Sequence, residues 1–111
     1  MSNRPVNLLL DDICEGIDRI EQYTQGMSYD IFSRDRKSVD AVARNLEIIG
    51  EAANRLPEDF KEKHSEIEWQ KIVGLRHRIV HEYFGIDLEI IWQIVSRDLL
   101  VLRKALSDLH Y

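Results

Sequence analysis

The sequence has little of what stabilises small secreted or membrane proteins. It holds one cysteine, Cys14, in 111 residues, so no disulfide can form within the chain and a disulfide-stapled domain is excluded. Its apolar runs are too short for a signal peptide or for a membrane-spanning helix. We therefore expect a cytoplasmic protein without membrane contact, in which Cys14 is a small, buried, reduced residue.

Glycine, proline and net positive charge are also scarce. Five glycines and two prolines are too few for the many turns of a β-sandwich. The net charge of -5 argues against a uniformly basic surface for nucleic acid, although it leaves room for a local phosphate site. Because 44% of the residues are hydrophobic and 32% are charged, the composition indicates a globular chain, and its length fits one domain, residues 1–111.

Helical periodicity dominates the rest of the chain. Apolar residues at spacings of three and four predict a helix from Pro5 to near Gly26 and a second from near Arg36 to Pro57. Ser28 is expected to cap a short helical turn between them, and residues 58–64 to form one irregular turn. Ser65 and Glu68 resemble a capping box for a third helix that ends at or before Gly85. Four main helices with short extra turns predict an all-α bundle.

The last helix is expected to begin after a cap at Asp87, with Glu89 in its first turn. Its main apolar stripe consists of Leu88, Ile91, Val95, Leu99, Leu102, Leu106 and Leu109. Further apolar residues lie off that stripe: Ile90, Trp92, Ile94 and Val101. This wide face indicates either a partner chain or deeper burial within the monomer, and the sequence favours neither.

The chemistry concentrates between Arg76 and Tyr83, where two arginines, two histidines and a tyrosine fall within eight positions. Arginine presents a fork of donors suited to phosphate, and histidine exchanges protons near neutral pH. A base, an acid and a phosphate-binding cation suffice to cleave RNA without metal, by attack of the ribose 2′-OH on the adjacent phosphate. Arg76, His81 and Tyr83 therefore mark a candidate site for such chemistry.

Helix geometry limits which of these side chains one helix can direct at the same phosphate. On an ideal helix Arg76 and His81 lie about 140° apart, whereas Arg76 and Tyr83 lie within about 20°. One straight helix therefore does not easily direct Arg76 and His81 at one phosphate. Either the helix distorts near Gly85, or two copies of the motif meet across the axis of a homodimer.

Structural or solvent-exposed roles are the alternatives to these functional assignments. His77 and His81 are spaced to share a metal, but the zincin pattern fails and no metal or other cofactor is expected. Arg78 is either a phosphate contact or a solvated charge. Glu51 could line the site or pair with Arg76, although an exposed carboxylate is the favoured reading.

The pattern Arg76-x4-His81-x-Tyr83 resembles the signature of the HEPN superfamily, in its HepT-like toxin branch. Residues 48–57, 69–75 and 83–87 and the leucine-rich last helix fit the same family, so the resemblance covers nearly the whole chain. It implies a HEPN-type four-helix bundle that dimerises around the motif helix. Arg76 and His81 would be catalytic, with His77 as an auxiliary group beside them.

The resemblance also implies a partner and a form of control. The chain would be the toxin of a type VII-like toxin–antitoxin pair, an endoribonuclease acting on mRNA or tRNA. A cognate minimal nucleotidyltransferase would silence it by transferring AMP to Tyr83. Two alternatives remain: a non-catalytic HEPN module that binds a nucleotide or its partner, and a structural dimer whose motif is an interfacial polar network.

Overall fold

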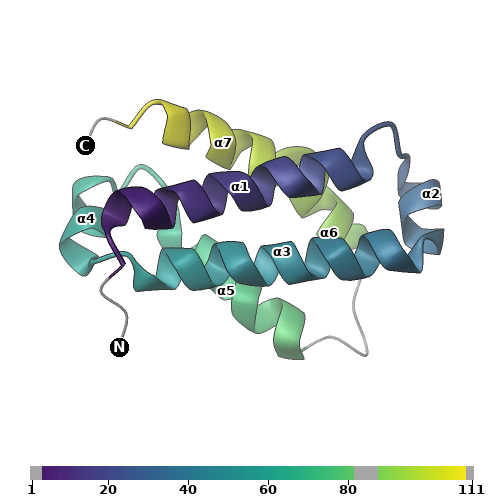
Figure 1. Cartoon of the computed structure of the whole chain (residues 1–111), viewed down its shortest axis with the longest axis horizontal. Coiled ribbons are helices and arrows are strands. Elements are labelled where there is room, and N and C mark those ends of the chain that lie inside the picture. The colour runs from purple at the N-terminus through teal and green to yellow at the C-terminus, as the bar shows by residue number, and fades with distance from the viewer. Residues whose placement is uncertain (1–3, 82–87, 110–111) are drawn as a thin grey trace.

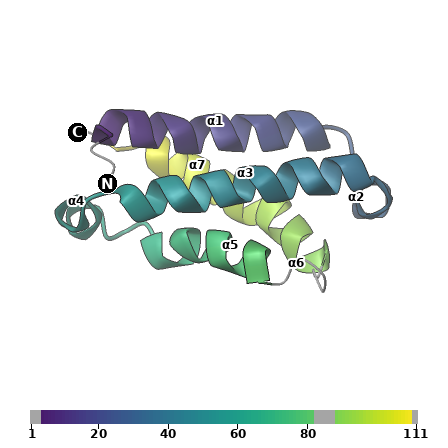
Figure 2. The same ribbon diagram turned by 60° about the horizontal axis from the view of Figure 1, so that its bottom comes forward.

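The fold is a bundle of helices around a central one. The computed structural model describes the backbone of residues 4–81 and 88–109 and the side chains of residues 4–75 and 88–109. Within those ranges every regular element is helical, which confirms the predicted all-α class. Helix α3 (Arg36–Arg55) lies between α1 (Val6–Thr24) and α5 (Trp69–His81), and the last helical segment crosses behind them (Figures 1 and 2). None of these described helices is long and apolar enough to cross a membrane.

The first two long helices follow their apolar periodicity. The Pro5 carbonyl accepts the first hydrogen bonds of α1, and Gly26, with a φ of +75°, follows its end. Their predicted stripes are buried against each other, including Ile13 and Ile17 on α1 and Leu46 and Ile49 on α3. Cys14 corrects one expectation: it is exposed, because it lies about 100° around α1 from the buried Ile13.

Side-chain caps define the short helix between them. Ser28 accepts a hydrogen bond from the backbone N–H of Ile31 at 3.2 Å, which confirms the predicted cap of α2 (Tyr29–Arg34). Asp35 then caps α3 by accepting from the N–H of Ser38 at 3.2 Å. The fully buried Phe32 anchors α2, with its ring centroid 5.1 Å from that of Trp92 in the last segment.

The joint before α5 differs from the prediction in two respects. Residues 58–64, expected to form an irregular turn, contain the helix α4 (Glu58–Lys63). The predicted cap at Ser65 is wrong, because α5 begins only at Trp69. The Glu68 carbonyl accepts the first hydrogen bonds of this helix, from the backbone N–H groups of Lys71 and Ile72. The Trp69 indole N–H donates to the His64 carbonyl at 3.0 Å, and this bond holds the intervening residues in a turn.

The last helix is not a regular α-helix throughout. It comprises α6 (Leu88–Gln93), the π-helical turn η2 (Ile94–Asp98) and α7 (Leu99–Ser107). A π turn holds more residues per turn than an α turn, so it rotates α7 relative to α6. Ile94 is thereby buried beside Val95, and Ile90 and Trp92 pack against the core. Val101 remains 71% exposed, so the wide apolar face is mostly, but not wholly, used within the monomer.

Candidate active site

Helix α5 carries most of the predicted site in its C-terminal half. Its N-terminal half is fixed by buried Trp69, Ile72 and Leu75, which pack into the core beside α3. The helix continues through His81, so the backbone at Arg76, His77, Arg78 and His81 is helical. Their side chains, and the whole of Tyr83 and Asp87, lie outside the described residues.

The helical backbone bears on whether a distortion of the motif helix could bring Arg76 and His81 together. Because α5 is α-helical at both Arg76 and His81, the two positions keep their separation of about 140° around one axis. The helix is not interrupted between Arg76 and His81, so no distortion within this segment directs them at one phosphate. Gly85, where a distortion was the other option, lies outside the described residues.

Helices α3 and α5 pack side by side and share a cavity at one end. Asn54 of α3 and Val73 and Gly74 of α5 line the same depression. The two helices run in opposite directions, since α5 starts beside the C-terminal end of α3 (Figure 2). Both rise by about 1.5 Å per residue, so each step back along α3 matches one step forward along α5. The C-terminal half of α5 therefore lies beside the middle of α3.

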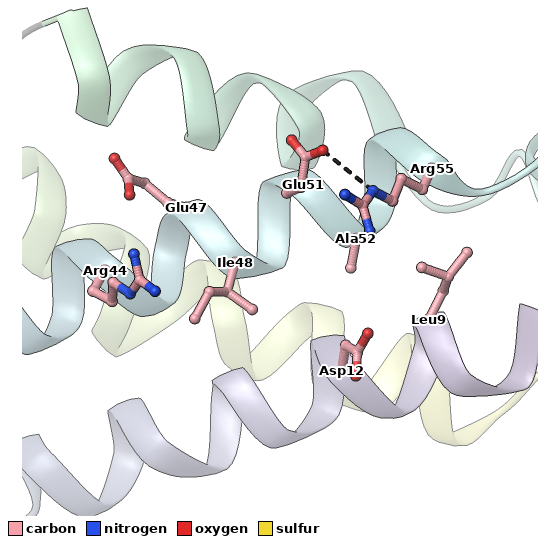
Figure 3. Close-up of a pocket in the computed structure, with 8 residues that line it drawn as sticks. All are labelled: Leu9, Asp12, Arg44, Glu47, Ile48, Glu51, Ala52 and Arg55. Atoms are coloured by element: carbon pink, nitrogen blue, oxygen red, sulfur yellow. Dashed lines mark ion pairs between the residues drawn. The ribbon is translucent and has the colours of Figure 1, made fainter. Parts of the chain in front are cut away.

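The side of α3 that carries Arg44, Glu47, Glu51 and Arg55 is rich in charge. A groove of about 370 Å³ runs between α1 and α3, lined by apolar Leu9, Ile48 and Ala52 and by charged Asp12, Arg44, Glu47, Glu51 and Arg55. Figure 3 shows Ile48 and Ala52 directed toward α1, whereas the carboxylates of Glu47 and Glu51 point to the opposite side, where α5 lies. Both glutamates are half-buried.

Ion pairs already hold some of these groups. Arg55 lies 3.3 Å from the Glu51 carboxylate, and Arg4 donates two hydrogen bonds to Asp12, at 2.8 and 2.9 Å. The bond to Asp12 raises the pKa of Arg4, so this guanidinium stays charged throughout the accessible pH range. Glu51 is thus a half-buried, paired carboxylate rather than the exposed one that the sequence favoured.

The described residues offer no metal site. No group of three or more histidine, cysteine, aspartate or glutamate side chains is arranged there to hold an ion. Trp69 is buried in the core, and Trp92 packs against that core beside Phe32. Whether His77 and His81 could share a metal concerns side chains outside this part of the chain.

Glu47 is the residue that the sequence analysis did not single out. The signal was present, because Glu47 and Glu51 are one helical turn apart and lie beside, not on, the buried stripe of α3. Sequence spacing alone does not say which helix packs against that side of α3. Only the antiparallel packing of α5 gives these two carboxylates their position beside the motif.

Comparisons with known proteins agree on one family. The family described as "Ribonuclease HepT-like" matches residues 13–109. A Thermococcus cleftensis protein named "Probable ribonuclease HepT" is 42% identical over 101 residues, which cover 91% of this chain and 92% of that protein. A Methanocaldococcus jannaschii protein named as a candidate RNase is 44% identical over 95 residues, covering 86% of this chain and 78% of its own length.

A bacterial relative gives the same result. A protein of Caldanaerobacter subterraneus, also named as a candidate RNase, is 36% identical over 100 residues, with 90% of this chain and 89% of the relative covered. No solved structure matches the chain.

Proposed function

Because the chain belongs to the HepT-like ribonuclease family, we propose that it is a metal-independent endoribonuclease whose catalytic pair is Arg76 and His81. The observation that carries this proposal is the placement of the whole Arg76-x4-His81 segment on one helix, packed along α3. His81 would transfer the proton of the ribose 2′-OH, and Arg76 would stabilise charge on the phosphate. His77 and Arg78 would be auxiliary groups that contact the substrate.

A homodimer supplies the geometry that one helix lacks. Since Arg76 and His81 point about 140° apart on a regular helix, a second copy of α5 near a twofold axis brings an Arg76 of one chain toward the His81 of the other. The exposed Val101 and Leu100 on α7 provide apolar surface for such a contact. We therefore place the two motif helices near the dimer axis.

Cleavage of RNA tests the proposal directly. The purified chain, incubated with single-stranded RNA in EDTA, should yield fragments that end in 2′,3′-cyclic phosphates. Arg76→Ala and His81→Ala should each abolish cleavage while the helical circular dichroism is retained. Arg34→Ala, an exposed arginine on α2, should cleave as the unmodified chain does. Activity that is lost in EDTA and restored by Mg²⁺ would contradict the mechanism.

Regulation by a cognate minimal nucleotidyltransferase is the second part of the proposal, and both partners would act in the cytoplasm. An AMP group on the hydroxyl of Tyr83 would place negative charge and bulk near Arg76, because these positions lie within about 20° on an ideal helix. Co-expression with the enzyme should raise the mass of the chain by whole AMP units, and Tyr83→Phe should prevent this. A neutralised chain of unchanged mass would show that the partner acts by binding alone.

The non-catalytic alternative predicts a different result in the same assays. A module that only binds a nucleotide or a partner would leave RNA intact, and Arg76→Ala would alter binding instead. A structural dimer would retain its oligomeric state and show neither effect. Family membership favours the ribonuclease over both.

A further inference from the structure

A hollow of about 730 Å³ lies where α3, α4 and α5 meet, at the end of the bundle where α5 begins (Figure 2). Sites for small molecules in proteins have volumes of this order. The apolar part of its lining is Ile67, Trp69 and Val73, and the first two of these are buried. Gly74 also lines it, and no described atom outside the adjoining turns of α5 lies within 4 Å of a methyl group built there. This space, the α4 hollow, is therefore open along one side of the motif helix.

The polar lining of the α4 hollow combines neutral amides with an excess of carboxylates. Its neutral polar residues are Asn54, Ser65 and Gln70, and its charged residues are Glu58, Lys61, Glu62 and Glu68. The side-chain amides of Asn54 and Gln70 form no hydrogen bond with any described residue. Lys61 lies 3.5 Å from the Glu58 carboxylate, so this lysine is already paired. The α4 hollow therefore disfavours anions, and it offers amides and acceptors to a neutral ligand that presents N–H groups.

The opposite charge follows directly along α5. Residues 76–81 include two arginines and two histidines and no acidic residue. The backbone of α5 is helical from Trp69 through His81, so position 81 lies only about 20° around the helix axis from Gly74 and about 10.5 Å further along it. The α4 hollow and the predicted catalytic position are thus on the same side of one helix, the first in acidic and the second in basic surroundings.

A nucleotide has two parts that match these surroundings, a neutral base with N–H groups and an anionic phosphate. We propose that the α4 hollow binds one base of the RNA substrate, with adenine as the preferred base. This inference rests on the proposed function, because it names the nucleotide that the ribonuclease recognises. The strand then continues along α5 toward residues 76–81, whose arginines suit its phosphates.

Hydrogen-bond chemistry selects adenine. A side-chain amide such as that of Gln70 or Asn54 can pair with both the amino group of adenine and the ring nitrogen beside it. A carboxylate such as that of Glu62 can accept the second N–H of the same amino group. Uracil carries a carbonyl oxygen in place of that amino group, and this oxygen is unfavourable beside carboxylates. The α4 hollow should therefore distinguish adenine from uracil.

The first part of the experiment measures binding without cleavage. Adenosine and uridine, which carry no phosphate, are titrated into the unmodified chain while NMR follows the side-chain N–H groups of Asn54, Gln70 and Trp69. The titrations are repeated with Asn54→Ala, Gln70→Ala and Gly74→Leu, of which the last fills the open space beside α5. The matched control is Gln22→Ala, which removes an exposed amide from α1.

Adenosine should bind about 10-fold more tightly than uridine, because a good amide–base pair discriminates between bases by about that factor or more. Each of the three variants should weaken the binding of adenosine by about 10-fold. Gln22→Ala should bind both nucleosides as the unmodified chain does.

The second part tests whether the bound base belongs to the substrate. An oligouridylate with a single adenosine, moved along the strand one position at a time, is incubated with the unmodified chain in EDTA. The cut should follow the adenosine at a constant separation of about three nucleotides or fewer, because Gly74 lies about 10.5 Å from position 81 and stacked nucleotides rise by about 3.4 Å. Gln70→Ala should raise KM for this RNA by about 10-fold with little change in kcat.

Three results would overturn the inference. Equal binding of adenosine and uridine, or binding of adenosine that is unchanged in Gly74→Leu, would show that the α4 hollow does not read a base. Cuts that ignore the position of the adenosine would show that the base bound there is not part of the substrate. Cleavage without base preference would thus refute this inference and retain the ribonuclease. A chain that binds adenosine but cleaves no RNA would refute the ribonuclease and, with it, the substrate role of the bound base.

Discussion

Two glycines, one on α1 and one on α5, lie in opposite surroundings. Gly16 of α1 faces the buried Ile49 of α3, and a methyl group built at Gly16 would lie 2.7 Å from Cγ1 of that side chain. Gly74 of α5 has nothing within 4 Å of the equivalent position. The first glycine therefore permits a close helix approach, whereas the second only weakens its own helix.

These surroundings predict opposite effects of the same substitution. Gly16→Ala should lower the free energy of unfolding by about 1 kcal/mol, because overpacking costs about 1–3 kcal/mol and the gain in helix propensity is smaller. Gly74→Ala should raise it by about 0.5–1 kcal/mol, the propensity gain alone. Urea denaturation of the two variants and the unmodified chain measures both. A stabilising Gly16→Ala would mean that Ile49 moves aside without cost.

Arg103 ties the last helix to the first. Its guanidinium donates to the carboxylates of Asp18 and Glu21 on α1, and the hydrogen bond to Asp18 raises the pKa of Arg103. Exposed ion pairs of this kind contribute about 1 kcal/mol at most. Arg103 thus contributes to the docking of α7 in addition to the apolar stripe.

At the scale of elements, the π turn at Ile94–Asp98 explains how Ile94, which lies off the predicted apolar stripe, is buried together with that stripe. A regular α-helix would place Leu88, Ile91, Val95 and Leu99 along one drifting stripe and leave Ile94 outside it. The extra residue in the π turn rotates α7 back, so that Ile94, Leu102 and Leu106 share the buried side with Ile91. The turn behaves as a single inserted residue within an otherwise regular helix.

This view predicts that one residue can be removed from the π turn. Deletion of exposed Ser96 should give a continuous α-helix that keeps both buried halves facing the core, with unfolding free energy changed by about 1 kcal/mol or less. Deletion of exposed Leu100, within α7, should instead rotate Leu102 and Leu106 by about 100° out of the core and cost several kcal/mol. Thermal unfolding compares the two. Equal losses would show that the π turn is not a removable insertion.

At the scale of the whole molecule, a groove flanks the motif helix. Ile72 and Leu75 of α5 and Ile94, Leu99 and Leu102 from the last segment form its apolar part, and Val101, which also lines it, is 71% exposed. Its charged lining residues are Glu66, Glu68, Lys71 and Asp98. A surface of this kind beside α5 fits a homodimer that brings the two motif helices together.

Charge placed on that surface should separate the proposed dimer. Val101→Glu should shift light scattering at micromolar concentration from dimer to monomer and lower RNA cleavage in parallel, because an unpaired carboxylate in an apolar contact is strongly unfavourable. Ile31→Glu, on α2 at 53% exposure, is the matched control and should change neither. Cleavage that persists in a monomer would show that one chain holds a complete site.

The amino-acid sequence by itself determined the class of fold, the limits of α1 and α3, the Ser28 cap and the identity of the motif. These follow from local causes: apolar residues every three or four positions, proline and glycine at helix ends, and a recognisable spacing of Arg76, His81 and Tyr83. The motif is a property of the chain alone, so the family it indicated, confirmed by the comparisons, could be inferred without coordinates.

Tertiary packing decided the remainder. The late start of α5 depends on the contact between Trp69 and the His64 carbonyl, and the π turn depends on which side chains of α6 and α7 meet the core. The position of Glu47 beside the motif depends on α5 running antiparallel along α3. In each case the deciding partner is distant in the sequence or on another element, and periodicity along one helix does not say which helix packs on which side.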